Sequence, residues 1–148
     1  MIKLIGSALV ISSLCSCTSQ MVVSGQANER TPLLGLPWGM WSKTQKGYGT
    51  VRPTTVFNGG DPTGLIEEIK WRYWGHAIAI GSGYGYFPTK AQGVASARRQ
   101  RATIVAFGLG SCNGVYVYNK VSVVVGTSRN FNRNFYINIC TGSYVGTS

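Results

Sequence analysis

Residues 114–125 read GVYVYNKVSVVV, and apolar and polar side chains alternate along this segment. Successive side chains of a β-strand point to opposite faces, so this pattern predicts a strand with one face on a core and one towards water. The apolar face would hold Val115, Val117, Val121, Val123 and Val125, and the opposite face Tyr116, Tyr118, Lys120 and Ser122.

Short runs of the same kind recur along the chain. They cover residues 49–57, 66–74, 76–87, 102–109 and 134–140, and are separated by turn-forming segments such as NGGDPTG at 58–64. Pro53 places the first strand at a sheet edge, and Gly75 predicts a β-bulge. We expect Trp71 and Tyr73 in the core, Trp74 exposed, and at most a helical turn in residues 91–101. The fold class predicted is all-β: a small antiparallel β-sandwich or barrel of about six to eight strands with one disulfide.

The N-terminus has the features of an export signal. Lys3 precedes the apolar run LIGSALVISSL (4–14), which is too short to cross a bilayer because that needs about 20 residues. Leu14-Cys15-Ser16-Cys17 resembles the lipobox of bacterial lipoproteins. The resemblance implies that residues 1–16, Cys15 included, are removed and that Cys17 receives a diacylglycerol group. We therefore expect an exported protein, lipid-anchored at the outer face of the cell membrane. If Cys17 is not lipidated, cleavage further along would give a secreted protein.

With Cys17 acylated, two cysteines with a thiol remain in the mature chain. An even pair in an exported protein favours a disulfide, so we expect Cys112 and Cys140 to be bonded. Two unpaired buried thiols are the alternative.

Residues 17–48 lack a sustained period and contain Pro32 and Pro37, so they are predicted to form a tether before a β-domain at residues 49–148. Within the tether, PLLGLPWGMW (32–41) is apolar and carries Trp38 and Trp41. This segment would either dock onto the domain, which we favour, or rest at the membrane interface.

Four stretches together resemble a group of small exported actinobacterial proteins of unknown function. They are IKWRYWG (69–75), IVAFGLGSCNG (104–114), VYVY (115–118) and INICTGSY (137–144), and the similarity spans residues 67 to 144. The resemblance implies that Cys112 and Cys140 belong to one framework. It implies no activity.

Catalytic patterns are weak. His76 is the single histidine, no G-x-S-x-G elbow accompanies it, and the adjacent Glu67 and Glu68 would point to opposite faces of a strand. The glycine-rich GSGYGY and GLGSCNG match neither the dinucleotide fingerprint nor the P-loop. We expect no enzyme activity, no catalytic residues, no cofactor and no metal site.

Charge favours binding to an anionic partner. The formal net charge is +10, from 14 basic and 4 acidic residues. The predicted contact residues are Lys90, Arg98, Arg99, Arg101, Arg129 and Arg133. The partner would be anionic lipid or an anionic wall polymer. The alternative is that these residues are only solvated loop charges. We expect no nucleic-acid partner, because the protein is expected to be exported.

The sequence thus predicts a non-enzymatic lipoprotein of the cell envelope with a basic binding face. One alternative is a carbohydrate-binding module that stacks sugars on Trp74, Tyr84 and Tyr86. Another is a phage-type exclusion or immunity lipoprotein that blocks an envelope partner.

Overall fold

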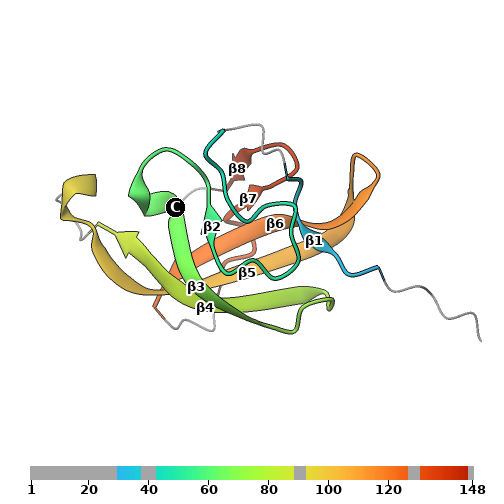
Figure 1. The fold of residues 1–148 in the computed structure, drawn as a ribbon, viewed down its shortest axis with the longest axis horizontal. Coiled ribbons are helices and arrows are strands. Elements are labelled where there is room, and N and C mark those ends of the chain that lie inside the picture. Colours follow the sequence, from blue (N-terminus) through green and yellow to red (C-terminus); the bar gives the residue numbers. More distant parts are fainter. Residues whose placement is uncertain (1–29, 38–42, 89–92, 127–130, 147–148) are drawn as a thin grey trace, which may run out of the picture.

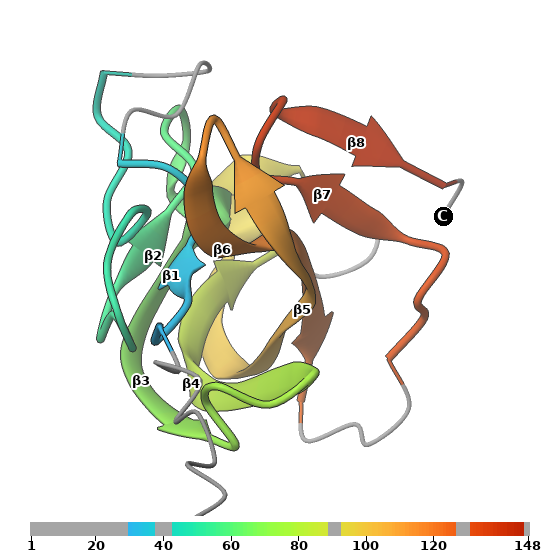
Figure 2. The same ribbon diagram turned by 90° about the vertical axis from the view of Figure 1, so that its right-hand side faces the viewer.

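A computed structural model describes residues 30–37, 43–88, 93–126 and 131–146. These residues form one eight-stranded sheet that curls into an antiparallel half-barrel (Figures 1 and 2), which confirms the all-β prediction. The strands are β1 (Leu33–Leu34), β2 (Val56–Phe57), β3 (Leu65–Arg72), β4 (Ile78–Phe87), β5 (Arg98–Cys112), β6 (Val115–Val125), β7 (Tyr136–Asn138) and β8 (Ser143–Val145). Two short 3-10 turns, Pro62–Gly64 and Val94–Ser96, are the helical elements of the described chain, and no helix in it is long and apolar enough to cross a membrane.

The sheet follows the chain from β2 to β8 in sequence order, each strand antiparallel to the next. The short β2 lies at one edge, as Pro53 predicted, because proline cannot donate to a strand ladder. β1 lies outside this order and pairs in parallel with the first half of β6.

Part of the segment predicted as a tether belongs to the fold. Leu33 and Leu34 of β1 lie opposite Val117 and Tyr118, and Leu34 is fully buried. Among the described strands, only β1 pairs with this part of β6 on this side, because β7 pairs only with the later residues Lys120 and Val121. The docking interpretation is therefore correct for residues 30–37, and the domain boundary expected at residue 48 was placed too late. Trp38 and Trp41 lie outside the described residues.

Glycines on the inner face of β4 shape the half-barrel. Gly81, Gly83 and Gly85 are buried and point inward. A Cβ on Gly83 would lie 2.5 Å from the backbone oxygen of Glu67, and one on Gly81 would lie 2.6 Å from Cγ2 of Ile69. These glycines therefore leave the space that side chains of the neighbouring strands fill.

The end of β3 corrects three sequence predictions. The bulge lies within β3, where the register shifts between Glu67 and Lys70 and Glu68 has φ +55°. Gly75 instead belongs to the turn between β3 and β4. Tyr73, expected in the core, is 63% exposed, whereas Trp74, expected at the surface, is 7% exposed. Tyr73 has φ +59°, so strand alternation ends at Arg72 and does not extend to these two rings.

A second irregularity brings Tyr118 into the core. In a regular strand every second residue faces the core. On two paired strands this spacing becomes three residues at one place, from Ala106 to Leu109 on β5 and from Tyr118 to Val121 on β6. Gly108, with φ +70°, lies at this place. Tyr118, predicted on the polar face, is consequently fully buried.

Two buried tyrosine hydroxyls have hydrogen-bond partners. The Tyr118 hydroxyl donates to the carbonyl of His76 (2.7 Å) and accepts from the Gly75 N–H (2.9 Å), and the Tyr48 hydroxyl donates to Oδ1 of Asn58. Burial raises the pKa of both phenols, since it disfavours the charged phenolate. Both side chains are therefore neutral, hydrogen-bonded parts of the core.

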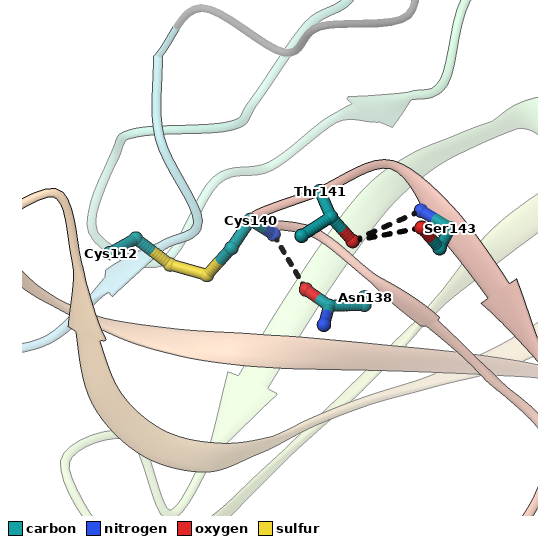
Figure 3. The surroundings of a disulfide bond; sticks show 5 residues. All are labelled: Cys112, Asn138, Cys140, Thr141 and Ser143. Carbon is teal, nitrogen blue, oxygen red and sulfur yellow. Dashed lines mark hydrogen bonds between the residues drawn. A yellow bond between two sulfur atoms is a disulfide. The ribbon is translucent and has the colours of Figure 1, made fainter.

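The disulfide joins two distant parts of the sheet (Figure 3). Cys112 ends β5, Cys140 follows β7, and their Cα atoms lie 5.8 Å apart. Oδ1 of Asn138 accepts from the Cys140 N–H (3.0 Å) and holds the turn that leads to β8. The predicted pairing is confirmed, and the bond ties the short β7–β8 hairpin to the long β5–β6 hairpin.

Replacing both Cys112 and Cys140 with serine should lower the free energy of unfolding by about 3–4 kcal/mol, as expected for a closed loop of this length. Urea unfolding of the oxidised protein and the double variant measures the difference. Two titratable thiols in the denatured, unreduced protein would contradict the disulfide.

Gly83→Ala should lower the free energy of unfolding by about 1–3 kcal/mol, because its Cβ would overlap the backbone oxygen of Glu67. Gly110→Ala is the matched control, since its Cβ would lie 3.4 Å from the nearest atom, Nδ2 of Asn119. Equal urea midpoints for the two variants would show that the inner glycines are not required for packing.

Candidate functional site

A groove of about 800 Å³ lies on the outer face of β3, β4 and β5. Its charged lining residues are Lys70, Arg72, Arg101 and Glu68. Its aromatic lining residues are Tyr73, Tyr84 and Phe131. Three cations against one carboxylate make this a positively charged hollow.

Strand register brings the three cations to one face. Lys70 lies opposite Ser82, Arg72 opposite Ile80, and Arg101 opposite Tyr84. Residues opposite each other in an antiparallel pair share a face, so Lys70, Arg72 and Arg101 all project outward. Trp71, between the two β3 cations, packs against the core, and its Nε1 donates to the Pro53 carbonyl (2.7 Å).

Arg99 differs from these cations because its charge is already paired. Its Nη2 lies 2.5 Å from Oε1 of Glu68, and its guanidinium carbon lies 3.9 Å from the centre of the Tyr84 ring. This is the one ion pair among the described residues, and both side chains are largely exposed. Such a pair contributes about 0–1 kcal/mol to stability, so its main effect is to neutralise the groove's carboxylate.

The basic residues predicted to bind an anionic partner do not all lie at the groove. Arg98, Arg99 and Arg101 lie on β5 and not in a loop, and only Arg101 lines the groove. Arg133 is exposed, and its guanidinium carbon lies 5.6 Å from the centre of the Phe131 ring, which lines the groove. The remaining predictions, Lys90 and Arg129, lie outside the described residues.

Two groove cations were missed at the sequence level. Lys70 and Arg72 stand in the stretch IKWRYW, and its alternation had already assigned them to a polar face. The missing information was that this face adjoins the face of β5 that carries Arg101. Only the pairing of β3, β4 and β5 in the folded protein shows that these two faces adjoin.

The three aromatic residues predicted to stack on sugars do not form one platform. Trp74 is buried, and its Nε1 donates to the Pro32 carbonyl (3.0 Å). Tyr84 and Tyr86 share the outer face of β4, but Arg99 lies over the Tyr84 ring. The prediction was wrong for Trp74 because the turn after Arg72 directs its ring into the core.

The described part of the chain offers few side chains for catalysis or metal binding. It contains no group of three or more His, Cys, Asp or Glu residues that could hold a metal ion. The side chain of His76 is exposed, while its backbone carbonyl accepts from Tyr118. The absence of enzyme activity stays a prediction.

No protein-family model, no curated protein and no solved structure matches this chain. The resemblance to small exported actinobacterial proteins therefore stays a prediction. Function has to be argued from the chemistry of the groove.

Proposed function

We propose that this protein is a non-enzymatic lipoprotein of the cell envelope whose half-barrel binds an anionic wall polymer along the groove. The observation that carries the proposal is the set of three cations, Lys70, Arg72 and Arg101, which line one hollow and have no ion-pair partner among the described residues.

The shape of the site favours a polymer chain over a flat lipid surface. A groove of about 800 Å³ can take in several groups of a chain, whereas a planar array of headgroups would not fill it. Arginine and lysine supply the donors that phosphate and carboxylate groups accept. The Tyr73 ring, which is 63% exposed, offers an apolar surface beside these charges.

The expected anchor is compatible with this role. Fully extended, the chain from Cys17 to Arg30 spans at most about 47 Å. A lipid on Cys17 would thus keep the groove within the polymer layer next to the membrane.

Replacing Arg72 and Arg101 with alanine should weaken binding to poly(glycerol phosphate) about thirtyfold at low salt, at about 1 kcal/mol for each cation. The matched control is Lys43→Ala with Lys46→Ala, which removes the same charge at two exposed positions outside the groove lining. Equilibrium binding at rising salt concentration gives the measurement, and affinity should fall with salt.

Three outcomes of that experiment would contradict the proposal. Equal losses in both double variants would show diffuse attraction. Preferential binding to phosphatidylglycerol vesicles would identify lipid as the partner. Salt-insensitive retention on neutral dextran would favour the carbohydrate-binding alternative.

The mature protein from its native host should begin at Cys17 and carry the mass of a diacylglycerol group. Cys17→Ser should release it from the membrane fraction into the medium. Intact-mass spectrometry of the N-terminus tests this expectation. An unmodified start between residues 25 and 28 would show that the protein is secreted and not lipid-anchored.

A further inference from the structure

A second hollow of about 500 Å³ lies apart from the groove and shares no lining residue with it. It is lined by residues from four segments: Arg30, Thr31, Pro32, Arg52, Trp74, Gly75 and Tyr116. The segments are the approach to β1, the loop before β2, the β3–β4 turn and the start of β6. Tertiary structure therefore assembles it from residues far apart in sequence.

Its charge is wholly positive. Arg30 and Arg52 are its two ionisable lining residues that are charged at neutral pH, and neither forms an ion pair within the described part of the chain. Two guanidinium groups beside one hollow match the oxygens of a phosphate or carboxylate, which each fork can bind through two parallel hydrogen bonds.

Arg52 is held in an unfavourable backbone conformation. Its φ is +50°, a left-handed value that side chains larger than glycine rarely adopt. The carbonyls on both sides of it are fixed, since Thr50 accepts from the Leu34 N–H (3.0 Å) and Pro53 accepts from Trp71 Nε1 (2.7 Å). Backbone strain of this kind clusters at active and binding sites, which supports a binding role for Arg52.

Two N–H donors of the hollow are already used. Trp74 Nε1 donates to Pro32, and the Gly75 N–H donates to the Tyr118 hydroxyl. The arginines are left as the principal donors for a ligand. Tyr116 is 37% exposed and offers a ring for stacking, while a Cβ on Gly75 would meet no atom within 4 Å, so there is open space beside it.

We infer that this hollow, named here the Arg30–Arg52 pocket, binds a small molecule that carries a phosphate or carboxylate on a planar ring. The oxyanion lies between the two guanidinium groups and the ring packs on Tyr116. This site is independent of the polymer groove.

Calorimetric titration with phenyl phosphate tests the inference. Arg30→Ala with Arg52→Ala should weaken binding at least tenfold, and Arg52→Lys should also weaken it, because lysine keeps the charge but lacks the planar fork. Lys43→Ala with Lys46→Ala removes equal charge from two exposed positions outside both hollows and should leave phenyl phosphate affinity unchanged. Benzoate distinguishes a carboxylate site from a phosphate site, and weaker binding of inorganic phosphate than of phenyl phosphate would support the ring contact.

The Arg52→Gly variant keeps the test valid if the protein with alanine at this position fails to fold. Glycine accepts the left-handed φ, so this variant should lose binding while its melting temperature stays the same or rises by about 3 °C. Unchanged affinity in the Arg30/Arg52 variants, or an equal loss in the Lys43/Lys46 variant, would overturn the pocket. Neither result would affect polymer binding, which is measured separately.

Discussion

The hydrogen bonds of Tyr118 connect the parts of this fold on which both candidate sites depend. Its hydroxyl accepts from Gly75 and donates to His76, so it fixes the turn between β3 and β4. Its backbone carbonyl accepts from the Gly35 N–H (3.0 Å), which secures the segment after β1. Its ring contacts Trp74 edge to face, with centroids 5.2 Å apart. One buried residue thus joins β6, the N-terminal segment and the turn between β3 and β4.

The turn fixed by Tyr118 separates two neighbouring rings. Tyr73 lines the outer groove, and Trp74 packs in the core and lines the Arg30–Arg52 pocket. The two hollows therefore lie on either side of one chain reversal. Both are positively charged, yet they differ in form: the groove suits an extended anionic chain, and the pocket suits a small anion with a ring.

Much of the fold could be predicted from sequence because alternation reports directly on strands. Residues 114–125 became β6, residues 66–74 cover all but the first residue of β3, and residues 76–87 contain β4. The misplaced core residues share one cause, which is nearby backbone with positive φ. At Glu68, Tyr73 and Gly108 the alternation shifts, and Glu68 and Tyr73 are not residue types that predict a positive φ. Trp74 and Tyr118 were misplaced for that reason.

The sequence by itself determined the high positive charge of this protein, and it was enough to predict the all-β fold class and the pairing of Cys112 with Cys140. Composition and local periodicity are enough for these conclusions, since they depend on residue types and spacing along the chain. Only the tertiary structure decided which cations share a surface. Lys70, Arg72 and Arg101 line one groove because of strand register, and Arg30 and Arg52 line one pocket because β1 docks on β6. Both arrangements depend on contacts between residues that are distant in sequence.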